Sequence, residues 1–181
     1  MRKLQAISAT TALSIMLVAC GAPSSNTGSA SEVSSFPIQN TQGEKIGTMT
    51  IESIKTGGVE VEINISGITP GSHAMHFHEF GRCDGPDFKS AGGHYNPAGV
   101  PHGHVDGGGH AGDMMNIEAN ADGTGLFNVT NDRVNIKGGS LPALMDADGT
   151  ALIIHDKADD YTSQPSGAAG PRVACAVIPA G

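Results

Sequence analysis

Strict alternation of apolar and polar residues over 59–66 constrains the fold of this chain more than any other feature. Successive side chains of a strand point to opposite faces, so the segment predicts a strand with one buried and one exposed face. The helical repeat does not fit it, and no other segment combines helical periodicity with capping residues. Further strand candidates, with alternation or short apolar runs, are 46–54, 75–80, 115–119, 125–130, 151–155 and 172–178.

Turn signals and two long loops separate the strand candidates. The chain holds 26 glycines and 10 prolines, and Asp122-Gly123 and Asp148-Gly149 are turn dipeptides. Residues 81–112 and 156–171 are too long for simple turns, and loops of such length in a compact domain are usually functional or disordered. The sequence therefore predicts an all-β sandwich or barrel with two long functional loops.

The N-terminal segment has the features of an export signal. Residues 1–3 are basic at Arg2 and Lys3, and the apolar stretch that follows is too short to span a bilayer. Cys20 stands between small residues, which resembles the bacterial lipoprotein box; the alternative is an ordinary signal with an incidental cysteine. We expect a signal peptide at 1–19, a lipid-bearing Cys20 with a flexible tether at 20–36, and one folded domain at 37–181.

Export places the domain in the cell envelope, on the periplasmic side, attached to the membrane through its N-terminal lipid only. Gly21, rather than an aspartate, after the lipidated cysteine favours the outer membrane. The compartment is oxidising, so Cys83 and Cys175, the two cysteines left after Cys20, can pair.

The chain is acidic, with a formal net charge of −8 that becomes more negative when Arg2 and Lys3 leave with the signal peptide. This balance argues against nucleic acid and anionic membrane surfaces as partners. An anionic substrate would need a local positive group.

Eight histidines crowd into one half of the chain, and imidazole is the commonest protein ligand for transition metals. His76 and His78, two apart on a strand, project from one face about 6.5–7 Å from each other. On the loop that follows, His94, His102 and His110-x-x-Asp113 supply three imidazoles and a carboxylate, a plausible tetrahedral zinc set. A set of imidazoles alone suits Cu(II) instead.

Each of these signals has a plainer interpretation. Two histidines on a strand are common, a histidine-rich loop can bind metals with low specificity, and His155 after an apolar run can be a hydrogen-bonded core residue. Together, at separate positions of one small β domain, they indicate metal binding.

Five motifs resemble the copper/zinc superoxide dismutases, in the family's order, within a stretch from about residue 38 to 180. They are His76–Gly81, Gly93–Pro97, His110–Asp113, Ile154–Asp160 and Gly170–Ile178. The lipoprotein start is similar to that of the periplasmic bacterial branch. The resemblance implies an eight-stranded Greek-key barrel that dismutates superoxide to dioxygen and hydrogen peroxide, with one copper and one zinc ion per chain.

The resemblance also implies roles for individual residues. The copper ligands would be His76, His78, His94 and His155; the zinc ligands would be His94, His102, His110 and Asp113. His94 would bridge the two metals, and Asp159 would hydrogen-bond one histidine of each site. Arg172 would position the superoxide anion, with Lys157 a weaker candidate, and Cys83–Cys175 would be the family disulfide.

Two histidines depart from the ligand pattern. His104, two residues after His102, lies where the family has no ligand and is an alternative to His102 at zinc. His73 resembles a family histidine with a structural, hydrogen-bonding role. Ala74 stands where a glycine is more familiar.

The expected function is therefore superoxide dismutase, an antioxidant enzyme. The main alternative is an exported copper/zinc buffer or delivery protein on the same fold, which would not need Arg172, His155 or Asp159. A third is a structural lipoprotein stabilised by zinc alone. The oligomeric state stays open, with a homodimer as one candidate.

Overall fold

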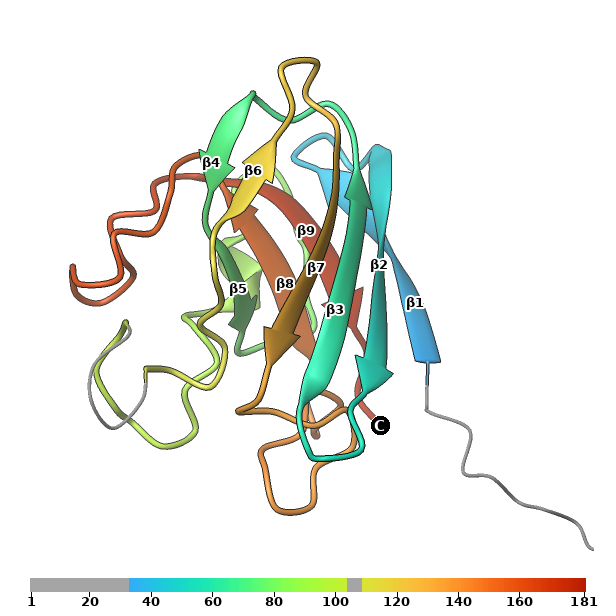
Figure 1. The fold of residues 1–181 in the computed structure, drawn as a ribbon, viewed down its shortest axis with the longest axis vertical. Coiled ribbons are helices and arrows are strands. Elements are labelled where there is room, and N and C mark those ends of the chain that lie inside the picture. The colour runs from blue at the N-terminus through green and yellow to red at the C-terminus, as the bar shows by residue number, and fades with distance from the viewer. Residues whose placement is uncertain (1–32, 104–108) are drawn as a thin grey trace, which may run out of the picture. The chain divides into compact units, whose positions relative to one another are not determined.

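The computed structural model describes residues 33–103 and 109–181 (Figure 1). They belong to a unit that spans Ser31–Gly181, and the preceding unit, Met1–Ala30, lies outside the described residues. The elements are β1 (Val33–Asn40), β2 (Lys45–Ser53), β3 (Val59–Ile65), β4 (Gly71–His73), β5 (Met75–His78), a short 3-10 helix (Lys89–Ala91), β6 (Ile117–Ala119), β7 (Gly125–Asn131), β8 (Thr150–His155) and β9 (Arg172–Ile178).

Seven strands form one curled antiparallel sheet in the order β5-β8-β9-β1-β2-β3-β7, and β4 pairs with β6. Only Ala74 separates β4 from β5, so counting these two as one interrupted strand gives eight. In Figure 1 the sheet curls so that β8 and β9 lie behind β7. The expected all-β Greek-key barrel is confirmed.

Burial follows the sequence pattern most clearly in β3 and β8. In β3 the apolar residues are buried and the intervening polar ones exposed, as alternation predicts. Every residue of β8 is buried, because its two faces meet different cores. Leu152 and Ile154 join the main core, while Ala151 and Ile153 pack with Phe88 in a smaller one. The strand that ends at His155 is thus fixed from both sides.

Two strands were not predicted from the sequence. β4 has only three residues, and β1 begins at Val33, inside the span expected to be tether. The first strand thus begins four residues before the expected start of the domain at residue 37. Polar composition suggested a tether, but Val33 pairs with Glu52 of β2, and the pairing runs to Gln39 with one register shift after Ile38. The six other expected strands, and β3, occur with shifts of no more than two residues at either end.

The disulfide between Cys83 and Cys175 ties the first long loop to β9, and it confirms the expected pairing. The two residues are 92 apart in sequence, and a cross-link over such a span stabilises a fold by roughly 4–5 kcal/mol in the chain-entropy model. In Figure 1 the second long loop and the later described part of the first lie on the left of the barrel.

Among the described residues, none of the helical segments has the length and hydropathy needed to cross a bilayer. The expected signal peptide at 1–19, Cys20 and most of the tether lie outside the described residues, as does His104.

Candidate metal centre

Neighbouring strands hold the first group of histidines. His76 and His78 stand on β5, which pairs with β8, and His155 ends β8 just past a register shift. His94 comes from the first long loop and forms an isolated bridge with His78. One ring nitrogen from each of these four buried residues lies within 4.8 Å of the others. We call His76, His78, His94 and His155 the four-histidine set.

Hydrogen bonds fix which nitrogen each ring of this set presents. The Nδ1 atoms of His78 and His155 donate to the carbonyl oxygens of Gly92 and Gly170, at 3.1 and 3.2 Å. A carbonyl oxygen can only accept, so Nε2 of both rings is left with a free lone pair. These Nε2 atoms, Nε2 of His94 and Nδ1 of His76 are buried without a hydrogen-bond partner. Such orphaned nitrogens are what a metal site requires.

The second group gathers around a carboxylate. Ligand atoms of His94, His102, His110 and Asp113 lie within 4.8 Å of one another, and we call these residues the mixed set. Nδ1 of His94 lies 2.9 Å from Asp113 Oδ1, Nδ1 of His110 lies 3.3 Å from the same oxygen, and Nδ1 of His102 lies 3.0 Å from Oδ2. Three imidazoles and one carboxylate match a closed tetrahedral zinc site.

The mixed set is tied unevenly to the sheet. Asp113 forms an isolated bridge with His76, as His94 does with His78. His110 is held by Asp113, because its backbone N–H donates to Oδ2 at 3.0 Å. Within the described residues, His102 forms no such backbone bridge with β5. His94 belongs to both sets, with Nδ1 facing one and Nε2 the other.

Asp159 connects the two sets from behind. Nε2 of His76 donates to its Oδ2 at 2.7 Å, and Nε2 of His102 lies 3.0 Å from its Oδ1. Gly167 leaves room for this carboxylate, since a Cβ there would lie 1.7 Å from Asp159 Oδ1 and 2.8 Å from His102 Nε2. A carboxylate in this position orients both rings and raises their basicity as ligands.

The protonation states suit metal binding. Burial lowers the pKa of His76 to about 4 and that of His155 to about 3, and it holds the pKa of His78 well below its ordinary value. Burial opposes ionisation of Asp113, but hydrogen bonds from His94 and the Gly103 N–H outweigh it and keep the pKa of this carboxyl below its usual range. Neutral imidazoles and an ionised carboxylate are therefore ready at neutral pH.

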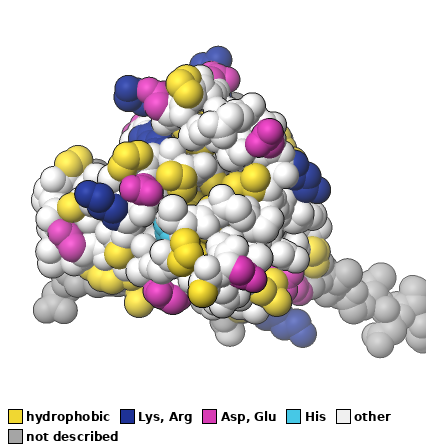
Figure 2. Space-filling model, turned by 90° about the horizontal axis from the view of Figure 1, so that it is seen from above, with side chains coloured by type: hydrophobic (Ala, Val, Ile, Leu, Met, Phe, Trp, Pro, Cys, Tyr) yellow, Lys and Arg dark blue, Asp and Glu magenta, His cyan; other side chains and the backbone are white. Residues whose placement is uncertain are grey.

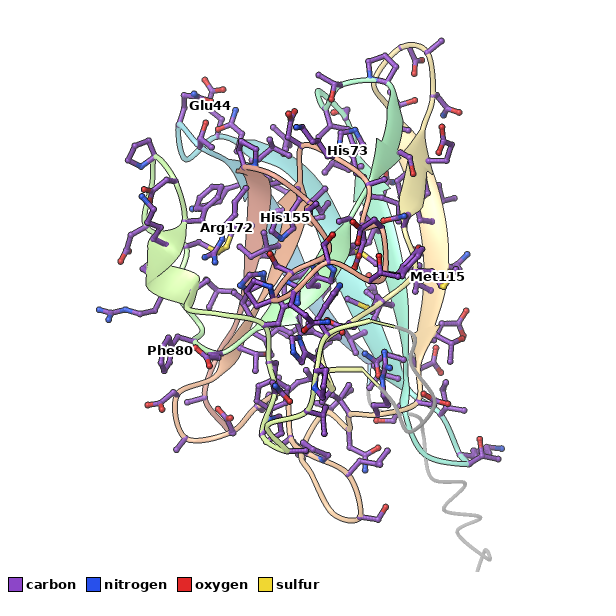
Figure 3. The ribbon with its side chains drawn as sticks, turned by 90° about the vertical axis from the view of Figure 1, so that its left-hand side faces the viewer. Glu44, His73, Phe80, Met115, His155 and Arg172 are labelled. Carbon is purple, nitrogen blue, oxygen red and sulfur yellow. A yellow bond between two sulfur atoms is a disulfide. The ribbon has the colours of Figure 1, made fainter. Side chains whose placement is uncertain are left out.

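A cavity of about 410 Å³ opens onto three rings of the four-histidine set, and Arg172, Glu79 and Ser166 also line it. Arg172 faces His155 across the β8–β9 pair (Figure 3). Its guanidinium donates to the carbonyl oxygens of Phe88 and Gly92 at 2.7 and 2.6 Å. Lys157, the weaker candidate from the sequence, is not in the lining. The seven described histidines are all buried, and the face seen in Figure 2 shows only a small patch of histidine surface.

His73 belongs to neither set. Its Nδ1 lies 2.6 Å from the carbonyl oxygen of His155 and its Nε2 lies 2.7 Å from that of Thr69. It therefore holds the end of β8 next to a ligand, which agrees with the structural role expected for it. Ala74, which interrupts β4 and β5, accepts a hydrogen bond from the His155 N–H at 2.9 Å.

Several supporting residues had no signal in the sequence. Asn116 exchanges two hydrogen bonds with the backbone of Asp159, at 2.8 and 3.0 Å, and its own N–H donates to the Tyr161 hydroxyl. At the end of β7, Asn131 Nδ2 donates to the Ala111 carbonyl at 2.9 Å and Arg133 donates to the Asp113 carbonyl. These polar residues look like solvated loop residues until the fold brings distant segments together.

Comparison with known proteins agrees with this geometry. A family profile described as copper/zinc superoxide dismutase (SODC) matches residues 45–178. The chain is 46% identical over 144 residues to a Cu-Zn superoxide dismutase of Aquifex aeolicus, covering 78% of this chain and 84% of that one. For a Cu-Zn superoxide dismutase of Caulobacter vibrioides the identity is 44% over 139 residues, covering 75% and 79%.

A solved structure has the same fold. The crystal structure of a superoxide-dismutase-like protein from Bacillus subtilis superposes with a TM-score of 0.77 at 36% identity, covering 82% of this chain and 99% of that chain. The matched stretch contains both groups of histidines and the disulfide described above. On this agreement of sequence, fold and site, the chain belongs to the copper/zinc superoxide dismutase family.

Proposed function

We propose that this chain dismutates superoxide to dioxygen and hydrogen peroxide, with one copper ion at the four-histidine set and one zinc ion at the mixed set. The observation that carries the proposal is the pair of buried four-ligand groups that share His94, with orphaned nitrogens facing inward. Bound copper would supply one-electron exchange between Cu(II) and Cu(I), and zinc, which has no redox chemistry, would order its ligands.

The protein's own residues would guide the substrate. Arg172 places a positive charge in the cavity beside His78 and His155, in a chain whose net charge is −8. Its two carbonyl partners and the disulfide at Cys175, three residues later, fix its position. A fixed cation in a partly desolvated cavity attracts a small anion locally even when the whole protein repels it.

His94 is the residue placed to manage a proton. Its Nδ1 faces Asp113 and its Nε2 faces the four-histidine set and the cavity. When Nε2 is free it can hold a proton within reach of a substrate beside Arg172, and give it up as peroxide forms.

The alternative is a copper/zinc buffer or delivery protein. The Bacillus subtilis relative is described as superoxide-dismutase-like, so the two functions have to be distinguished by this chain's own site. A buffer needs neither a guanidinium in the cavity nor the bridge from Asp159 to both sets. Both are found here, which favours the enzyme.

Measuring superoxide decay by the copper- and zinc-loaded mature protein tests the proposal directly. We expect a second-order rate constant near the diffusional range for an enzyme of this family. Stoichiometric binding of both metals without accelerated decay would favour the buffer.

The zinc assignment has its own test. We propose His102, which lies in the mixed set, over His104, two residues later. The His102→Ala variant should lose zinc and the His104→Ala variant should keep it, as measured by metal analysis after gel filtration. The reverse result would show that the zinc loop is threaded differently.

We also propose that the protein is a lipoprotein anchored at Cys20 on the periplasmic side of the envelope, with the outer membrane favoured. The basic start, the short apolar stretch and small residues around Cys20 support this. Mass spectrometry of the N-terminal peptide and membrane fractionation test it: an unmodified Cys20 in a soluble fraction would contradict it. A homodimer is a further hypothesis, which sedimentation of the mature protein can test.

A further inference from the structure

Gln164, in the second long loop, makes an unusual pair of contacts with His102. The backbone N–H of His102 donates to Gln164 Oε1 at 2.9 Å, and Gln164 Nε2 donates to the His102 carbonyl at 2.9 Å. One side-chain amide thus satisfies both backbone polar groups of a residue that is 0% exposed. A neighbouring strand does the same for residues in a sheet.

His102 is the mixed-set ligand that most needs such support. His94 and Asp113 are bridged to β5, and His110 is hydrogen-bonded to Asp113. The ring of His102 lies 3.0 Å from Asp159 and 3.0 Å from Asp113, and the next N–H, that of Gly103, donates to Asp113 Oδ2 at 3.1 Å. The partner of the His102 backbone N–H and carbonyl oxygen themselves is Gln164. Asp159 and Gln164 both come from the loop at 156–171, about 60 residues further along the chain.

The segment that carries Gln164 is itself a compact turn next to the cavity. The backbone N–H groups of Thr162 and Ser163 donate to Asp160 Oδ1 at 2.9 and 2.7 Å, and the Gly167 N–H donates to the Ser163 carbonyl at 2.7 Å. The next two residues, 165 and 166, line the cavity that holds Arg172. A shift of the Gln164 backbone therefore moves the cavity wall.

We infer that Gln164 is a positioning residue that sets zinc affinity through the backbone of His102 and couples zinc binding to the wall of the substrate cavity. The inference rests on the proposed zinc site. Zinc that fixes His102 would also fix the turn at 160–166, and by linkage an ordered turn would tighten zinc binding by the same factor.

Two substitutions separate the two hydrogen bonds. Gln164→Met keeps the length of the side chain and removes both bonds, whereas Gln164→Glu keeps an acceptor for the His102 N–H and removes the donor to its carbonyl. The matched control is Gln42→Met, the same change at another loop glutamine, in the turn between β1 and β2. Gln164 is exposed, so both variants should fold.

The first measurement is zinc affinity of the copper-loaded, disulfide-bonded protein, by competition with a chelator. We expect Gln164→Met to weaken zinc binding roughly 10- to 100-fold, the usual effect of removing a partner that orients a ligand. Gln164→Glu should lie between this variant and the wild type. Gln42→Met should bind zinc as the wild type does, and copper affinity should not change in any variant.

The second measurement is hydrogen exchange, with and without zinc. In the wild type, zinc should slow exchange of the amides at 160–167 as well as that of His102. Gln164→Met should lose the protection of the His102 amide and the response at 160–167. Gln164→Glu should keep the protection of the His102 amide, because its acceptor remains. A role limited to general loop stability would not distinguish these two variants.

The outcomes separate this inference from the proposed function. Wild-type protein that binds no zinc would overturn both. Wild-type protein that binds zinc, with Gln164→Met binding it equally tightly, would overturn the inference alone. Equal losses of zinc and copper affinity in Gln164→Met would do so as well, since they would indicate loosening of the whole centre.

Discussion

The two halves of the metal centre are built in different ways. Three ligands of the four-histidine set stand on β5 and β8, where sheet pairing and two cores fix their backbones. The mixed set comes wholly from a loop, tied to β5 by single bridges at His94 and Asp113 and elsewhere by side chains. The barrel therefore preforms the copper half, whereas the zinc half depends on contacts between loops, with His94 joining the two.

Removing the shared residue should show this difference most strongly. His94→Ala takes one ligand from each set, but the three strand-borne or strand-end histidines remain in place. We expect it to keep some copper and to lose most zinc and much of the activity, with zinc affinity falling by more than roughly 100-fold, beyond the effect of losing an outer-shell partner. Metal analysis measures this, and full zinc occupancy would refute the shared-ligand assignment.

Arg172→Glu tests the cavity beside the copper half without touching a ligand. Local electrostatic focusing changes association rates by roughly 10–10³, and we expect a fall in the second-order rate constant within that range at unchanged metal content. The wild-type rate should decrease as ionic strength rises, and the variant's response should flatten or reverse. If rate and salt response stay the same, Arg172 has only a structural role.

Acidification of the metal-free protein should lower its stability first through its buried histidines, most of which belong to the copper half. The folded-state pKa values of His76 and His155, about 4 and about 3, lie below the ordinary 6.5, so the unfolded chain binds more protons below that pH. Their contribution is present above pH 6.5 and is lost as the pH falls toward the folded values. The pKa of His110 is lowered as well, so its contribution is lost over the same pH range. The lowered pKa values of Asp113 and Asp159 affect stability only when the pH falls below the ordinary aspartate pKa of 3.8.

Denaturant unfolding at pH 7 and pH 5, with the disulfide intact, measures this loss. His155→Gln removes one of the groups and should make the dependence shallower. A wild-type stability that is equal at the two pH values would count against neutral, buried rings.

The smallest expected effect concerns the attachment of the zinc turn to β7. Asn131→Ala removes the hydrogen bond to the Ala111 carbonyl, and a net contribution of about 0.5–1.5 kcal/mol corresponds to zinc affinity weaker by up to about tenfold. Copper affinity should not change, because the side-chain hydrogen bonds shown for Asn131 go to Ala111 and Arg133 and not to the four-histidine set. Asn128→Ala, an exposed change on the same strand, is the control. Equal losses of both metals would mean that the halves are not independent.

The same contrast explains what could be predicted from the sequence. β3 and β8 were predicted because alternation and an apolar run are local signals, and the spacing of His76 and His78 follows directly from strand geometry. β1 was missed because its serines and Pro37 resemble a tether. What makes the segment a strand is its pairing with residues 45–52, and no pattern within the segment itself indicates that pairing.

Within the site, each expected ligand lies in one of the two sets, because family motifs carry residue types in a fixed order. The supporting residues had no such signal. Gln164 acts 62 residues away from its partner and Asn116 acts 43 residues away. These side-chain amides have a role only because the folded chain brings the loops into contact.

Gly167 shows how far a metal centre extends beyond its ligands. This residue supplies no ligand atom and has no side chain, yet a single added methyl group would occupy the place of the Asp159 carboxylate. A natural variant with alanine at this position would keep every ligand and every charge. A comparison of its metal-binding motifs with the family pattern would find no difference. Such a variant would still disturb the metal site. Surveys of sequence variation in this protein should therefore group Gly167 with the metal-binding histidines rather than with ordinary loop residues.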